Sequence, residues 1–217
     1  VASIDAMADY LATFVKLHYK GKKFSIVAMS YGFVVATRML SKYPDIAAKV
    51  ELVVSLAGLT DKQEFIVPKT TFAFWKFTSV AFDGPIRAWL FRYVILQPVF
   101  IRTIYGLQAK SHPKMKGADK AELKKRIDFE IHLWHANDVR TYVHVTRDIL
   151  RLKTPPAQIE SPCLHVSIST DQYVDHVLVE KHIKELYTKV SVTEDKMPNH
   201  APTIISDKKE AAAFIPS

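Results

Sequence analysis

Two hydrophobic patterns alternate along the chain. Short continuous apolar runs rich in β-branched residues predict strands at 24–29, 50–56, 163–168 and 189–193. Segments with apolar residues three or four apart predict helices at 3–18, 33–42, 177–186 and 208–214. Strands that alternate with helices are typical of an α/β fold with a mostly parallel sheet and flanking helices. We expect the strand at 24–29 to be buried on both faces, because its apolar run is continuous.

One long stretch breaks this rhythm. Residues 60–157 contain no convincing strand pattern, and prolines at 85, 98 and 113 separate helical segments, with a helix at about 138–152 leading back to the sheet. So long an insertion between two strands of a sheet is typical of a lid or cap over a site. We therefore expect two parts, a sheet-containing core at 1–59 and 158–217, and a helical cap insertion at 60–157. The insertion is rich in aromatic residues, among them Phe72, Phe74, Trp75, Phe77, Phe82, Trp89, Phe91, Tyr93, Phe100 and Tyr105.

The amino-acid composition excludes some classes of protein. The 217 residues include 48% hydrophobic and 24% charged residues, which excludes a disordered or collagen-like chain. The formal net charge is +8, and the lysines and arginines are spread along the sequence. Their densest cluster, at 110–126, is interrupted by Asp119 and Glu122. This arrangement favours a solvated surface, and with no zinc-finger or RNA-binding pattern we expect no nucleic-acid partner. The single cysteine, Cys163, lies in an apolar run, which favours a buried structural role.

A short motif connects the first predicted strand to the next helix. The segment Ala28-Met29-Ser30-Tyr31-Gly32 has the form small-x-Ser-x-small, which a tight nucleophile elbow requires. A serine on such a turn exposes its hydroxyl at the end of the sheet. The helix behind it presents backbone N–H groups and a positive dipole end, so the N–H of Tyr31 is the expected first oxyanion donor. The pentapeptide is equally compatible with a serine that only caps a helix.

The serine also needs a base and an acid. Asp171 follows the strand at 163–168, and His200 follows the strand at 189–193 in the loop Asn199-His200-Ala201. The order serine, acid, histidine is the one that this type of elbow requires. The predicted catalytic residues are therefore Ser30, Asp171 and His200.

At these residues the chain resembles the α/β-hydrolase superfamily. The resemblance rests on the elbow, on Asp171-Gln172-Tyr173-Val174 after a strand, and on the loop with His200. It implies a serine esterase or lipase-like enzyme that cleaves an ester, thioester or amide through an acyl-enzyme, with no cofactor and no metal.

The chain departs from that family at its start. The superfamily has several strands before the elbow, and a loop that supplies the second oxyanion donor, whereas this sequence begins at Val1, just before the first predicted helix. We therefore expect that this is the C-terminal part of the fold, completed by a missing N-terminal segment or by a partner chain. A cytoplasmic location is expected.

Rival residues remain for each catalytic role. Asp175 and Asp61 are alternative acids, although Asp171 fits the family position best. His176, beside the acid loop, is expected to face solvent. A metal site formed by His132, His135 and His144 is conceivable, but no carboxylate or cysteine completes the set, so ordinary surface histidines are favoured.

The substrate is the least determined feature. An aromatic cap favours an apolar acyl or aromatic group in a small ester or lipid, although the same aromatics could simply pack the cap. Arg87 and Arg92 among them suggest contact with an acidic substrate or anionic lipid headgroups, and therefore a peripheral membrane contact. The alternative function is a non-catalytic binding module of the same fold.

Overall fold

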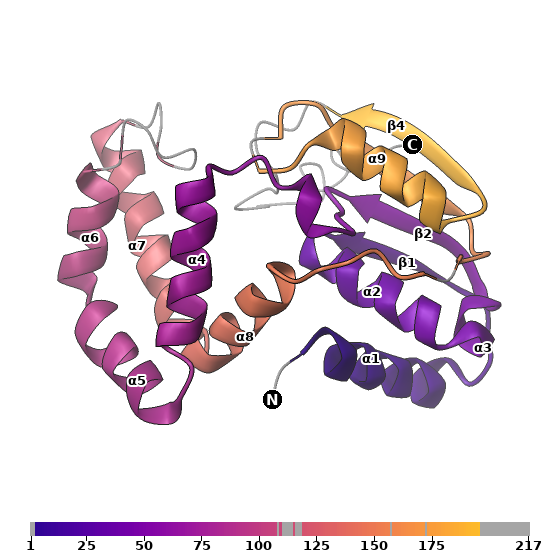
Figure 1. Ribbon diagram of the computed structural model, residues 1–217, viewed down its shortest axis with the longest axis horizontal. Coiled ribbons are helices and arrows are strands. Elements are labelled where there is room, and N and C mark those ends of the chain that lie inside the picture. The colour runs from indigo at the N-terminus through magenta and orange to yellow at the C-terminus, as the bar shows by residue number, and fades with distance from the viewer. Residues whose placement is uncertain are drawn as a thin grey trace. The chain divides into compact units, whose positions relative to one another are not determined.

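The structure is a computed structural model that describes residues 3–107, 109, 115, 119–156, 158–171 and 173–195. The chain divides into two compact units, one formed by residues 69–150 and the other by residues 2–68 and 151–217 (Figure 1). We call them the helical unit and the sheet unit. The predicted helix at 208–214 lies outside the described residues.

In the described residues, the sheet unit contains four parallel strands in the order β1-β2-β3-β4. This confirms the predicted parallel sheet, and it places the carboxyl ends of all four strands at one edge. In chain order its elements are α1 (Ile4–Tyr19), β1 (Phe24–Met29), α2 (Tyr31–Lys42), α3 (Pro44–Ala47), β2 (Val50–Leu56), the 3-10 turn η1 (Lys62–Glu64), β3 (Cys163–Ile168), α9 (His176–Leu186) and β4 (Val190–Asp195).

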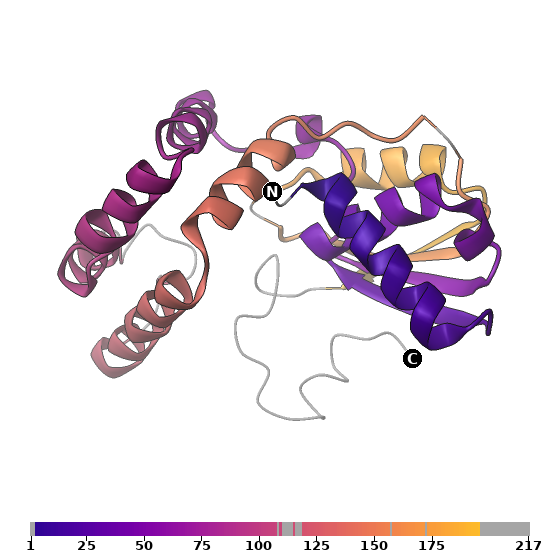
Figure 2. The ribbon, with the colours of Figure 1, turned by 90° about the horizontal axis from the view of Figure 1, so that it is seen from below.

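Helices α1, α2 and α9 cover the same face of the sheet (Figure 2). Side chains alternate between the two faces of a strand, so Val53 and Cys163 join the core beneath these helices. Val54 and Val166 point to the opposite face, where they form a smaller apolar cluster with Leu56. The main core therefore lies between the sheet and the three helices.

Strand β1 corrects one expectation. It pairs only with β2 among the described residues, and Val27 at its centre is 58% exposed. Phe24 and Ala28 are buried, because they point toward α1 and α2. The continuous apolar run is therefore buried on one face only, since no described helix covers the other face of this edge strand.

The helical unit contains α4 (Lys69–Ala81), α5 (Pro85–Leu90), the π-helical turn η2 (Phe91–Ile95), α6 (Pro98–Leu107), α7 (Lys120–Ala136) and α8 (Val139–Ile149). It has a core of its own, formed by Ala88, Leu96, Ile101, Val139 and Val143. Among the described residues, no helix combines the length and apolarity needed to cross a bilayer.

Side-chain caps explain where several helices begin. Ser3 caps α1 by accepting a hydrogen bond from the N–H of Ala6, and Asp119 and Asp138 cap α7 and α8 in the same way. Lys20 has a left-handed conformation at the end of α1, and Gly21 follows it with a positive φ of 82°.

Candidate active site

Ser30 occupies the junction between β1 and α2 in a strained backbone conformation. Its φ is 48° and its ψ is −118°, a region that a non-glycine residue rarely adopts. The N–H of Ser30 donates to the carbonyl of Leu56 at 2.9 Å, and its own carbonyl accepts from the N–H of Phe33 at 3.0 Å. These hydrogen bonds tie the turn to the end of β2 and to the first turn of α2. The side chain is half-buried.

The small residues beside Ser30 do not all have the same reason to be small. Ala28 is buried beneath α2, as the tight turn requires. A Cβ added to Gly32 would meet no described atom within 4 Å outside its chain neighbours and the backbone of its own helix. The closer approach is at Gly58, where a Cβ would lie 2.6 Å from the Phe33 ring. Gly58 therefore lets the end of β2 pack directly against the helix that follows Ser30.

Asp171 lies on the loop after β3, beyond the same edge of the sheet as Ser30. Its N–H donates to the carbonyl of Ile168 at 3.1 Å. Its Oδ1 accepts from the N–H of Tyr173 at 2.8 Å and, at 3.3 Å, from that of Val174. One carboxylate oxygen of Asp171 therefore stabilises the loop on which this residue lies.

That loop is tied to the segment after β2. Phe65 and Val174 form an isolated antiparallel bridge. On either side of it, the N–H of Ile66 donates to the carbonyl of Tyr173 at 3.0 Å, and the N–H of Asp175 donates to the carbonyl of Glu64 at 2.7 Å. These bonds fix the loop that carries Asp171 against residues 64–66.

Glu64 anchors this second segment from inside the protein. Its carboxylate is fully buried and accepts from the N–H of Thr60 at 2.8 Å and from the Thr60 hydroxyl at 2.7 Å. The same carboxylate lies 2.7 Å from Nδ1 of His182 on α9. The sequence reasoning missed this cluster, because nothing in the local pattern brings residues 64 and 182 together.

The two rival acids have other hydrogen-bonding roles. Asp175 is the N-cap of α9, and its Oδ1 accepts from the N–H groups of Val177 and Leu178. Asp61 caps η1, and its second oxygen accepts from the N–H of Thr154 at 3.2 Å. Asp61 therefore links the segments that leave and re-enter the sheet unit.

Of the predicted catalytic residues, Ser30 and Asp171 are described and His200 lies outside the described residues. The structure thus places the first two beyond the ends of β1 and β3. His176 is half-buried rather than solvent-facing, because it begins α9 and, together with Asp171, lines a small hollow. This corrects the expectation for His176.

Two other reactive side chains of the sheet unit are buried. Burial raises the pKa of the Cys163 thiol to about 12, which agrees with a structural cysteine. Burial also lowers the pKa of His165 to about 4, and its Nδ1 lies 3.2 Å from Oγ of Ser55 inside the sheet. Ser55 and His165 are almost completely inaccessible, so this serine–histidine pair cannot reach a substrate.

The described histidines of the helical unit differ in their surroundings. Nε2 of His135 lies 2.9 Å from the carbonyl oxygen of Leu96, whereas Nε2 of His144 lies 3.6 Å from a carboxylate oxygen of Asp83. His132 is exposed on α7. Within the described part of the chain, no cluster of histidine, cysteine and carboxylate side chains could hold a metal ion.

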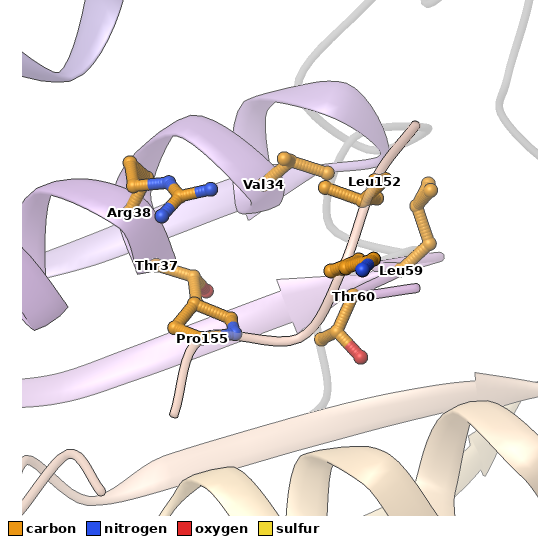
Figure 3. Close-up of a pocket in the computed structure, with 8 residues that line it drawn as sticks. Val34, Thr37, Arg38, Leu59, Thr60, Leu152 and Pro155 are labelled. Atoms are coloured by element: carbon orange, nitrogen blue, oxygen red, sulfur yellow. The ribbon is translucent and has the colours of Figure 1, made fainter. Parts of the chain in front are cut away.

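The described hollows differ greatly in size. One hollow of the sheet unit, separate from that beside Asp171, measures about 10 Å³, room for roughly one water molecule. It lies where Val34 and Thr37 of α2 face Leu152 and Pro155 (Figure 3). The helical unit contains a cavity of about 710 Å³, within the range of small-molecule sites. Most of its lining is apolar, including Phe74, Trp75, Phe82, Phe91, Trp134 and Tyr142.

Comparison of the whole structure with solved structures identifies the fold. Structures similar to it include the esterase RhEst1 from Rhodococcus sp. ECU1013, with a TM-score of 0.57 and 15% identity over 98% of this chain and 71% of that one. MenH from S. aureus matches with a TM-score of 0.56 and 13% identity over 92% and 67%. A third match is MGS-M2, an α/β hydrolase from a Medee basin deep-sea metagenome library, with a TM-score of 0.55 and 15% identity over 89% and 63%. The chain has the α/β-hydrolase fold.

The α/β-hydrolase fold is shown by structure alone. No protein-family profile and no curated protein sequence matches the chain. The chain spans about two thirds of the length of the α/β-hydrolase structures that it matches.

Proposed function

We propose that this protein is a serine hydrolase in which Ser30 is the nucleophile, Asp171 the acid and His200 the base. The observation that carries the proposal is the strained conformation of Ser30 at a strand–helix junction. Strain of roughly 1–3 kcal/mol at one residue persists only when the surroundings impose it, and such residues gather at functional sites.

The reaction follows the usual chemistry of such a triad. His200 takes the proton of the Ser30 hydroxyl while Oγ attacks the carbonyl carbon of the substrate. The resulting oxyanion accepts a hydrogen bond from the N–H of Tyr31, the first residue of α2 and thus close to the positive end of the helix dipole. The tetrahedral intermediate collapses, the leaving alcohol, thiol or amine takes the proton from His200, and an acyl-enzyme forms. Water, activated by His200, then hydrolyses that ester and regenerates Ser30.

We propose an ester with an apolar acyl or aromatic group as the substrate. The support is the apolar cavity of the helical unit, whose volume and aromatic lining suit such a group. On this proposal the helical unit acts as the cap, and carboxylester hydrolysis is the reaction that we expect.

A fluorophosphonate probe, which reacts with activated serine hydroxyls, tests the assignment of Ser30. We expect the protein to be labelled at Ser30, as mapped by peptide mass spectrometry. The Ser30→Ala variant should lose labelling completely, and His200→Gln should reduce the labelling rate by at least roughly a hundredfold. Ser25→Ala, on the exposed part of β1, is the matched control and should be labelled normally.

Unlabelled Ser30 in the correctly folded protein would contradict the enzyme assignment. It would favour the alternative, a non-catalytic binding module of the same fold. The exposed face of β1 around Val27 would then be the first surface to examine for a partner.

A further inference from the structure

A stripe of large apolar side chains runs along the outside of α5 and η2. Ile86, Trp89, Leu90, Tyr93 and Val94 are all more than two fifths exposed, with Trp89 at 56% and Tyr93 at 53%. We call these five residues the α5–η2 stripe. They are three or four positions apart, the spacing that places residues on one face of a helix. In a helix of a water-soluble domain such a face is normally buried, whereas here it faces outward.

The next helix of the same unit also exposes large apolar side chains. Val99, Phe100, Ile104 and Leu107 on α6 are exposed as well. Single exposed apolar residues are ordinary, whereas apolar residues that gather on one helix face mark interaction sites, and the stripe is such a set.

Arginines outnumber carboxylates around the stripe. Arg87 and Arg147 act electrostatically on Asp83. Arg92 and Arg140 act in the same way on Asp138. Residues 85–107 contain three arginines and no aspartate or glutamate. Arg87 lies on α5 and Arg92 on η2, so both belong to the elements that carry the stripe. In the described part of the chain, neither guanidinium forms an ion pair: Arg87 donates to the carbonyl of Asp83, and Arg92 donates to the carbonyls of His135 and Asn137. Arg102 is paired with Asp128 at 3.0 Å.

We propose that the α5–η2 stripe docks onto the surface of a membrane that contains anionic lipid. Tryptophan and tyrosine prefer the boundary between headgroups and acyl chains, so Trp89 and Tyr93 suit that depth. Ile86, Leu90 and Val94 would enter the apolar region beside them, and the arginines of α5 and η2 would meet lipid phosphates. An excess of positive charge around an apolar stripe is complementary to an anionic bilayer. The proposal is independent of the assignment of Ser30.

Co-sedimentation with lipid vesicles tests the proposal. We expect the protein to bind vesicles of equal parts phosphatidylcholine and phosphatidylserine more tightly than vesicles of phosphatidylcholine alone. The double variant Trp89→Ser/Tyr93→Ser should weaken binding to both by roughly tenfold or more, since it removes two inserted side chains. Arg87→Gln should weaken binding to the phosphatidylserine vesicles alone, by roughly fivefold.

The matched control is Tyr10→Ser/Leu17→Ser, which removes two exposed apolar side chains from α1 and should leave binding unchanged. If the double-serine variant misfolds, the conservative variant Trp89→Phe provides a second test. Brominated phosphatidylcholine should quench the tryptophan fluorescence of the vesicle-bound protein, and Trp89→Phe should remove most of that quenching.

Failure of the protein to bind vesicles would overturn the proposal. Stripe variants that bind vesicles as tightly as the original protein does would overturn it as well. A change of oligomeric state in the stripe variants, measured by size-exclusion chromatography with light scattering and without any change in vesicle binding, would instead show that a second copy of the chain covers the stripe.

Discussion

Ser30 shows how the surroundings of one residue hold it in an unfavourable backbone conformation. Its N–H donates to the carbonyl of Leu56 in β2, and its carbonyl accepts from the N–H of Phe33 in the first turn of α2. Gly58 allows Phe33 of α2 to approach the end of β2 closely. The conformation of Ser30 therefore depends on packing between elements as well as on its own pentapeptide.

His165 makes the stability of the protein depend on pH. Burial lowers its pKa from 6.5 to about 4, so below pH 6.5 the unfolded chain binds a proton that the folded protein does not. The free energy of unfolding should therefore fall as the pH falls from about 6.5 to 4, by up to about 3 kcal/mol from this residue. Urea unfolding at several pH values measures the slope.

His165→Asn should flatten that slope, whatever its effect on the overall stability. His18→Gln, at an exposed position on α1, is the control and should retain the slope of the original protein. An unchanged slope in His165→Asn would show that this histidine does not titrate as expected.

At the scale of elements, the buried Glu64–His182 contact joins η1 to α9 and thereby supports the loop with Asp171. Removing the Glu64 carboxylate leaves its buried hydrogen-bond partners on Thr60 and His182 unsatisfied, which typically costs about 1–3 kcal/mol. We expect Glu64→Ala to lower the free energy of unfolding by about this amount. The amide protons of Ile66 and Asp175, which bond the two segments, should exchange faster with solvent.

A double-mutant cycle with His182→Ala should give a coupling energy of about 0.5–3 kcal/mol. Glu180→Gln is the matched control, because Glu180 forms an exposed pair with Lys184 on the same helix. Exposed pairs of this kind contribute about 0–1 kcal/mol, so both amide exchange rates should stay unchanged. Unchanged exchange in Glu64→Ala would show that the loop is held without the buried carboxylate.

At the scale of the whole molecule, the two units provide different parts of the proposed function. The sheet unit carries Ser30 and Asp171, and the helical unit carries the apolar cavity. Thr146 lines this cavity, so Thr146→Phe should reduce its volume. We expect kcat/KM for a long-chain p-nitrophenyl ester to fall by roughly tenfold or more, with little change for the acetate ester.

Thr103→Phe is the control for this test. Thr103 is exposed on α6 of the same unit and is not part of the cavity lining, so both esters should be hydrolysed at the original rates. Equal losses for long and short esters in Thr146→Phe would contradict an acyl-binding cavity.

Much of the fold could be predicted from periodicity. The strands at 24–29, 50–56 and 163–168 begin and end where the pattern indicated, because short β-branched runs in a parallel sheet are bounded by turn and helix signals. The exposed face of β1 could not be predicted, since a continuous apolar run does not tell which helices will cover a strand. The role of Asp175 as an N-cap and the half-buried position of His176 also depended on where α9 begins.

The sequence by itself determined the parallel α/β arrangement and placed Ser30 at a strand–helix junction and Asp171 after a strand, because local periodicity and turn residues encode such positions. The tertiary structure alone decided the strain at Ser30, the Glu64–His182 contact behind the acid loop, the cavity of the helical unit and the outward direction of the α5–η2 stripe. Each of these depends on contacts between residues far apart in the chain. Such contacts exist only once the elements have packed, so no local pattern could have specified them.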